Sequence, residues 1–127
     1  MSAKWKRALG LAVACGMSTC MVAMADSYYD YSKSIDVENL VYTAVKVKEV
    51  SGKAYVDQQY NKTATVKCTM ANSAHTAKSD TCTLTGVDTV NPSYSGYTVT
   101  VGDYICLRLK NPSSNGSAIT VKGSWRP

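Results

Sequence analysis

Tyr97–Lys110, YTVTVGDYICLRLK, is the stretch that decides the fold of this chain. Two short alternating runs flank Gly102-Asp103, and this pair is typical of a turn because glycine accepts backbone angles that other residues avoid. In the second run three aliphatic residues share one side, and they are Ile105, Leu107 and Leu109. The residues on the other side are Tyr104, Cys106, Arg108 and Lys110. A period of two predicts a β-strand with one buried face.

The rest of the chain repeats this pattern in short segments. Further strands are predicted over residues 40–50, 54–59, 63–70, 81–85 and 118–125. Turn residues separate these segments, and strand-forming Val, Ile, Thr and Tyr are abundant. The sequence therefore predicts an all-β fold, a single sandwich of about seven antiparallel strands.

The first 25 residues have the layout of a secretory signal peptide. Lys4, Lys6 and Arg7 precede a small apolar stretch, and Ala23-Met24-Ala25 forms a cleavage site. The apolar stretch is shorter than the roughly 20 residues that a membrane-spanning helix needs. We expect cleavage after Ala25 and export to the periplasm, the cell surface or the extracellular medium.

Cleavage would leave one small domain with little net charge. Removing the 25 leader residues from the 127-residue chain leaves 102. The leader holds three of the 14 basic residues and none of the nine acidic ones, so the remainder carries a net charge of +2. This balance does not support nucleic acid or an anionic membrane as the partner. We expect a protein partner or self-assembly, with no membrane contact after cleavage.

Residues 26–34, DSYYDYSKS, are polar and rich in tyrosine. They are predicted to form an N-terminal arm, and the sandwich domain then spans residues 35–127. Chain termini are commonly frayed, but tyrosine also offers a large contact area at low entropy cost. Both interpretations stay open, and the second makes Tyr28, Tyr29 and Tyr31 the predicted partner contacts.

The C-terminal part of the chain resembles a family of surface modules. The pattern of a strand, a Gly-Asp corner and a strand of alternating aliphatics with an outward Arg is similar to that of bacterial immunoglobulin-like and fibronectin-III-like modules. The matching residues are Gly102, Asp103, Ile105, Leu107, Arg108 and Leu109. The serine-rich loop and the segment AITVKG also fit, so the resemblance covers about the last thirty residues. It implies an Ig-like sandwich that is exposed at the cell surface and is not catalytic.

Tyr104-Ile105-Cys106 also imitates the Tyr-x-Cys of a true immunoglobulin domain. An inward Cys106 would carry Arg108 into the core and expose the three aliphatic residues. Burying each aliphatic side chain contributes about 1.5–3 kcal/mol, whereas burying an unpaired arginine costs free energy. We therefore predict that the aliphatic side faces the core and that Cys106 lies on the opposite side.

Three cysteines follow the leader, and exported proteins commonly form disulfides. Cys68 and Cys82 fall on the core side of their segments, with a polar loop between them. Closing a loop of this size contributes about 3 kcal/mol. A Cys68–Cys82 disulfide is predicted, with Cys82–Cys106 as the alternative, and the third thiol is buried or pairs between chains.

No motif in the sequence predicts catalysis, a metal or a cofactor. Cys68, His75 and Cys82 lack the C-x-x-C spacing that is typical of zinc, and His75 is predicted to be a solvated loop residue. The carboxylates of the strand region are scattered singly, and Asp103 is expected to cap the Gly-Asp corner. We therefore predict that the protein is not an enzyme and has no catalytic, cofactor-binding or metal residues.

Two functions fit these features. The first is a structural or adhesive module of the bacterial surface, a fibre subunit whose arm completes a neighbour's sheet by strand addition. The second is a monomeric periplasmic or secreted binding or inhibitor module that grips its partner through the loops at 71–80 and 111–117. The sequence alone does not choose between them.

Overall fold

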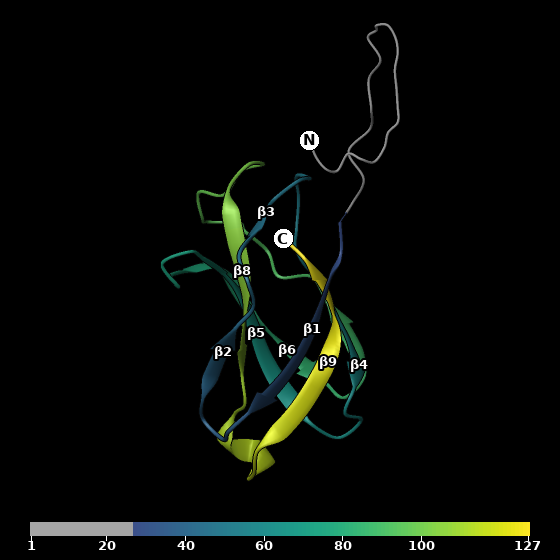
Figure 1. Ribbon diagram of the computed structural model, residues 1–127. Coiled ribbons are helices and arrows are strands. Elements are labelled where there is room, and N and C mark those ends of the chain that lie inside the picture. The colour runs from purple at the N-terminus through teal and green to yellow at the C-terminus, as the bar shows by residue number, and fades with distance from the viewer. Residues whose placement is uncertain (1–26) are drawn as a thin grey trace, which may run out of the picture.

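The described part of the chain, residues 27–127 of a computed structural model, forms two antiparallel sheets that pack face to face (Figure 1). The predicted signal peptide, residues 1–25, lies outside the described residues. The first sheet has the order β1 (Tyr29–Ile35), β9 (Ile119–Arg126), β4 (Tyr55–Tyr60) and β7 (Asp88–Val90). The second has the order β2 (Leu40–Tyr42), β8 (Tyr104–Lys110), β5 (Thr65–Asn72) and β6 (Ala77–Thr85). The predicted all-β sandwich is confirmed.

Two short elements complete the fold. β3 (Lys46–Val47) also pairs with β8, and η1 (Ser113–Asn115) is a single 3-10 turn. Within residues 27–127 there is no helix long and apolar enough to cross a lipid bilayer.

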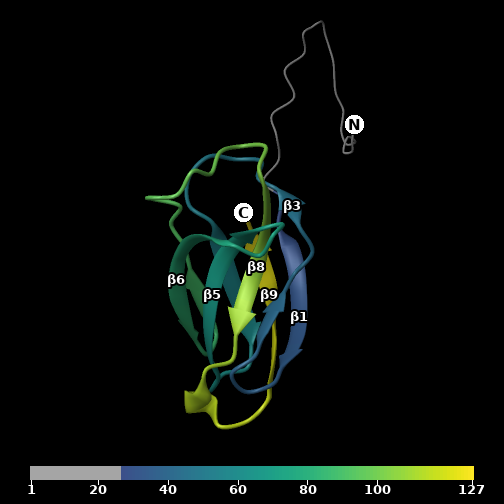
Figure 2. The same cartoon turned by 90° about the vertical axis from the view of Figure 1, so that its left-hand side faces the viewer.

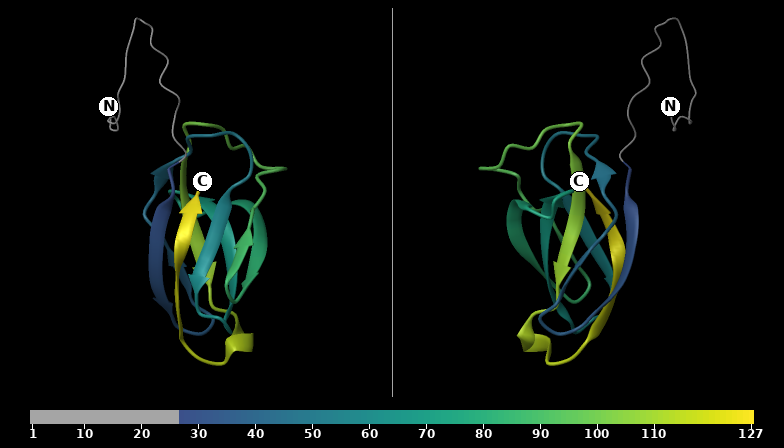
Figure 3. Two further views of the ribbon diagram at one scale, coloured as in Figure 1. Left: turned by 90° about the vertical axis from the view of Figure 1, so that its right-hand side faces the viewer. Right: turned by 60° about the vertical axis from the view of Figure 1, so that its left-hand side comes forward.

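The first and last strands of the sandwich are neighbours. β1 runs antiparallel to β9 along its whole length, and the two lie side by side at one edge of the first sheet (Figure 3). The order β1-β9-β4-β7 facing β2-β8-β5-β6 is that of a jelly roll. In an immunoglobulin constant-type sandwich the first and last strands belong to different sheets. The connectivity therefore differs from the Ig-like order that the sequence resemblance implied, because alternation reports which side is buried and not which strands are neighbours.

The predicted N-terminal arm is part of the sandwich. Most of residues 26–34 lie in β1, whose Tyr31 and Ile35 belong to the core and are 4% and 1% exposed. Tyr31 lies across Gly123 of β9, where an added Cβ would approach the tyrosine hydroxyl to 2.8 Å. The arm is therefore an edge strand that fills its own chain's core, and the alternation of Tyr29, Tyr31 and Ile35 with polar residues is the signal of this strand.

The buried side of β8 is the one that the sequence predicts. Ile105, Leu107 and Leu109 are all at most 1% exposed and belong to the central cluster. Arg108 lies on the outer face of the second sheet, opposite Thr69 of β5. Residues of both sheets complete this cluster, among them Trp125, Val121, Val56, Val66, Met70 and Leu84. The phase assignment for β8 is confirmed.

One extra residue interrupts the strand predicted over residues 40–50. Tyr42 of β2 lies opposite Arg108, whereas Lys46 of β3 lies opposite Ile105. This strand therefore advances four residues while β8 advances three, which is the two-against-one count of a β-bulge. Thr43 fills the interruption, since it donates its N–H to Leu107 O at 3.0 Å and its hydroxyl accepts the Leu107 N–H at 2.9 Å.

The extra residue exchanges the two faces of the strand. Val41 packs against the core, but Val47, which would share its side in an unbroken strand, is 39% exposed. Lys46 and Lys48 turn to the inner side instead, because a shift of one residue moves every following side chain to the other face. Lys48 is as a result only 2% exposed.

Candidate functional site at the loop end

Three loops gather at one end of the sandwich, which we call the loop end. They are residues 48–54, 72–76 and 91–103, and the last residue, Pro127, lies at the same end (Figures 1 and 2). The loop 111–117 with η1 lies at the opposite end, where the side-chain amides of Asn111 and Asn115 tie it down. The sequence had suggested that the loops at 71–80 and 111–117 bind one partner together. In the structure they lie at opposite ends of the sandwich, so they do not form one binding surface.

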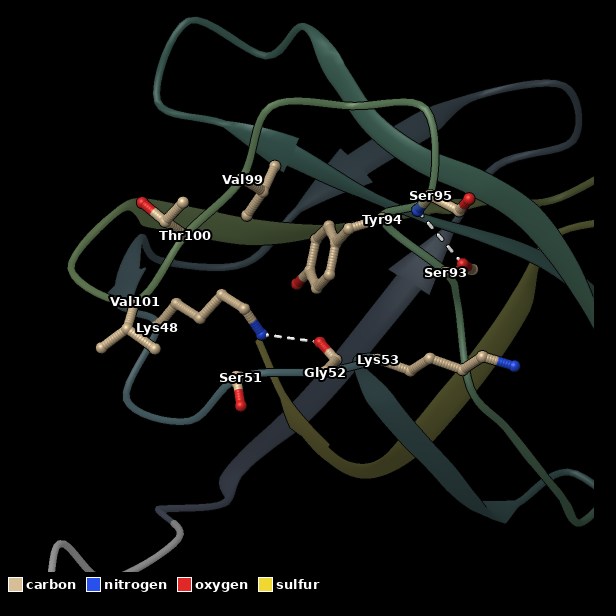
Figure 4. Close-up of a pocket in the computed structure, with 10 residues that line it drawn as sticks. All are labelled: Lys48, Ser51, Gly52, Lys53, Ser93, Tyr94, Ser95, Val99, Thr100 and Val101. Atoms are coloured by element: carbon tan, nitrogen blue, oxygen red, sulfur yellow. Dashed lines mark hydrogen bonds between the residues drawn. The ribbon is translucent and has the colours of Figure 1, made fainter.

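A pocket of about 360 Å³ opens between the loops 48–54 and 91–103 (Figure 4). We call it the loop-end pocket, and the lining residues that matter below are Lys48, Gly52, Tyr94, Val99, Thr100 and Val101. Its volume lies within the range of ligand pockets, about 300–1,000 Å³. Among the described residues that line it, Lys48 and Lys53 carry positive charge and none is an Asp or Glu.

Lys48 places a buried cation at this pocket. Its Nζ donates to the main-chain oxygens of Gly52 at 2.9 Å and Pro127 at 3.4 Å, and it lies 4.5 Å from the centre of the Tyr94 ring. Burial and the neighbouring positive charge of Arg126 lower the pKa of Lys48. Because a buried cation is costly unless it is well paired, this lysine is an unusual choice for a position that only has to pack.

Tyr94 brings a second buried polar group to the same place. The residue is 8% exposed, and its hydroxyl, which is screened from solvent, has no hydrogen-bond partner. Figure 4 shows this hydroxyl pointing towards the Lys48 side of the pocket. Burial raises the pKa of Tyr94, so the phenol stays protonated at neutral pH and can donate a hydrogen bond. An unsatisfied buried hydroxyl costs about 1–3 kcal/mol.

The Gly-Asp corner follows directly after Thr100 and Val101, which line the loop-end pocket. Gly102 has a φ of 101°, which glycine tolerates best, and the Asp103 carboxylate accepts the Thr100 N–H at 3.0 Å. Asp103 therefore caps the corner as predicted. On the other side of this corner a second hollow of about 460 Å³ is lined by residues that include Asn72, Lys78 and Tyr104.

The three described cysteines are free thiols in this structure, so the predicted disulfide is not formed. Cys68 and Cys82 nevertheless lie directly opposite each other on β5 and β6. The alternative Cys82–Cys106 is ruled out by the sheet, because β5 lies between their strands and Cys106 is on the outer side, next to Asn72 O at 3.6 Å. Burial raises the pKa of Cys68 to about 12, so this thiol is not ionised at neutral pH.

The tyrosines predicted to contact a partner divide into three environments. Tyr31 is in the core and is not available to a partner. Tyr29 is partly buried against Trp125. Tyr28 is 49% exposed, and its ring meets that of Tyr55 edge-on at 5.4 Å. Tyr28 alone of the three presents a large exposed surface.

His75 is exposed and lies in the loop between β5 and β6, which agrees with the solvated loop residue that the sequence predicted. Its ring stacks on Tyr42 of β2 with 3.6 Å between the ring centres, across the outer face of the second sheet. Among residues 27–127, no three His, Cys, Asp or Glu side chains come together in a group that could hold a metal ion.

The two residues that define the loop-end pocket were not predicted from the sequence. Lys48 belongs to the short basic segment Lys46–Lys48, and an unbroken strand would place both of its lysines on the outer face. Tyr94 lies in the loop between β7 and β8, where no periodicity reports its burial. The usable signal for Tyr94 is a large aromatic residue inside a stretch rich in Pro, Ser and Gly.

No protein-family model, no curated protein and no solved structure matches this chain.

Proposed function

We propose that the chain is an exported, non-catalytic binding module that works as a monomer and holds its ligand or partner at the loop end. The observation that carries this proposal is the convergence of the Lys48 ammonium and the Tyr94 hydroxyl on one pocket. Both groups are costly to bury, and aliphatic side chains would fill the same space at lower cost. Polar groups that stay in a pocket despite this cost in stability indicate that the pocket recognises a ligand.

The surface around the loop-end pocket supports the same proposal. Tyr97, Val101 and Tyr104 are 42%, 53% and 61% exposed, and Val47 lies directly opposite Tyr104. Exposed aromatic and aliphatic residues beside a hollow are typical of contact surfaces, because their burial on binding is favourable.

A fragment screen by NMR tests where this module binds. The chain from Asp26 to Pro127, labelled with ¹⁵N, is titrated with small neutral, cationic and anionic compounds. We expect saturable shifts of the amide signals to concentrate in residues 48–54 and 91–103. The loop 111–117 serves as the internal control, since side-chain amides hold it in place. Hits that concentrate at 111–117, or on the outer face of either sheet, would contradict the proposal.

A second candidate is self-assembly as a subunit of a surface fibre, and the position of β1 favours it. β1 is an edge strand near the start of the chain that supplies Tyr31 and Ile35 to the core. An exchange of β1 between copies would preserve all its contacts, which is the logic of domain swapping and strand addition. In this form of assembly, β1 of one copy replaces the identical β1 of a neighbouring copy rather than filling an open groove.

Size-exclusion chromatography with light scattering separates the two candidates. The chain from Asp26 is run over a range of concentrations, with and without reductant, and the fractions are imaged by electron microscopy. The binding proposal predicts a single monomer peak under all these conditions, because β1 already fills its own core. Ladders or filaments that persist in reductant would contradict the binding proposal and would support exchange of β1 between copies.

We also propose that export leads to a bridge between Cys68 and Cys82. Directly opposed residues of antiparallel strands have Cα atoms about 4.5–5.5 Å apart, within the range of about 4.4–6.8 Å that disulfides span. A thiol oxidant of the export compartment would accept the two electrons and two protons that the thiols lose.

Mass spectrometry of the exported protein tests this bridge. We expect a mass lower by two hydrogen atoms and a cross-linked peptide that joins Cys68 to Cys82. Reduction should lower the free energy of unfolding by about 3 kcal/mol. Cys106→Ala is the matched control and should leave the bridge intact, whereas Cys82→Ala should abolish it. Recovery of the fully reduced chain, or of a bridge that contains Cys106, would show the assignment to be wrong.

A further inference from the structure

We propose that the loop-end pocket binds a small organic carboxylate. This inference rests on the proposed binding function at the loop end and names the class of ligand that the chemistry there would recognise. It follows from three features of the pocket, which are its charge, a hydrogen-bond donor without an acceptor, and its apolar wall.

The charge of the pocket favours an anion. The Lys48 ammonium donates to the main-chain oxygens of Gly52 and Pro127 and makes a cation–π contact with the face of the Tyr94 ring, so its positive charge lies at the pocket wall. Arg126 adds positive charge close to Lys48, and no Asp or Glu among the described residues lines the pocket. Lys53 also lines the pocket, but its ammonium points away from Lys48 and Tyr94 (Figure 4). A bound anion would offset this concentration of positive charge, and electrostatic attraction is stronger in a partly buried site than in water.

The hydroxyl of Tyr94 supplies a second donor for the same group. The ammonium lies 4.5 Å from the centre of the tyrosine ring, so the two donors are close neighbours. A carboxylate has two oxygens and can accept from both at once. The Tyr94 hydroxyl is screened from solvent in the free protein, so the side chains around it must move before a ligand can accept its hydrogen bond.

The remaining wall favours a ligand with a carbon skeleton. Val99, Val101 and the Tyr94 ring present apolar surface to the pocket. A volume of about 360 Å³ leaves room beyond the carboxylate for several carbon atoms. An inorganic anion would leave this apolar wall in water, which is why we assign an organic ligand.

The test compares three probes on the chain from Asp26 to Pro127 at pH 7. Cyclohexanecarboxylate carries both features, cyclohexylmethanol has the ring without the charge, and inorganic phosphate has the charge without the ring. We expect cyclohexanecarboxylate to cause saturable NMR shifts at Gly52, Tyr94 and Thr100, with clearly weaker binding of the other two. Equal or tighter binding of cyclohexylmethanol or phosphate would overturn the assignment.

Tyr94→Phe provides the decisive variant because it removes one oxygen and no packing surface. Loss of a hydrogen bond to a charged group should weaken cyclohexanecarboxylate binding about tenfold or more. Thermal stability should be unchanged or higher, since the hydroxyl has no partner in the free protein. Tyr31→Phe is the matched control, as it removes another buried, unpartnered hydroxyl that packs on Gly123 in the core, and it should leave affinity unchanged.

The possible results separate this inference from the function on which it rests. Unchanged affinity in Tyr94→Phe, or equal losses in both tyrosine variants, would overturn the carboxylate assignment. If neutral probes alone shift the loop-end signals, the ligand class is wrong but the binding site stands. If neither these probes nor the broader fragment screen shifts any loop-end signal, both proposals fail.

Discussion

β8 pairs along one edge with two short strands whose registers differ by a single residue, and the loop end depends on this offset. Had β2 continued into β3 without the extra residue, Val47 would face the core and Lys48 would face water. With the extra residue, Val47 is exposed and Lys48 carries its ammonium under the loops. A bulge that redirects a side chain next to a pocket is a recurring device in β-proteins.

The jelly-roll connectivity supplies the surroundings of this lysine. Because the last strand, β9, lies inside the first sheet between β1 and β4, it delivers Arg126 and Pro127 to the loop end. The main-chain oxygen of Pro127 accepts from Lys48, and Arg126 adds a second positive charge nearby. The aliphatic side of β8 and the ring of Trp125 stabilise the sandwich below, which allows the loop end to hold polar groups that do not improve packing.

The sequence predicts those parts of the fold that follow from the alternation of apolar and polar residues along a strand. The burial of Ile105, Leu107 and Leu109 follows from a period of two, and so does the shared side of Cys68 and Cys82. The offset before β3 was not predictable, because Thr43, Ala44 and Val45 contain no glycine or other turn residue to mark it. The strand order and the burial of Tyr94 depend on contacts between distant segments, which local periodicity does not report.

The pKa of the Lys48 ammonium tests the central claim most directly, because the register offset is what buries this group. Its side-chain signals, assigned with the help of Lys48→Arg, can be followed by NMR as the pH is raised. Burial near Arg126 predicts that Lys48 titrates below the ordinary lysine value of 10.5. A Lys48 that titrates at 10.5, as a lysine in water does, would place it outside the sandwich and contradict both the offset and the loop-end pocket built on it.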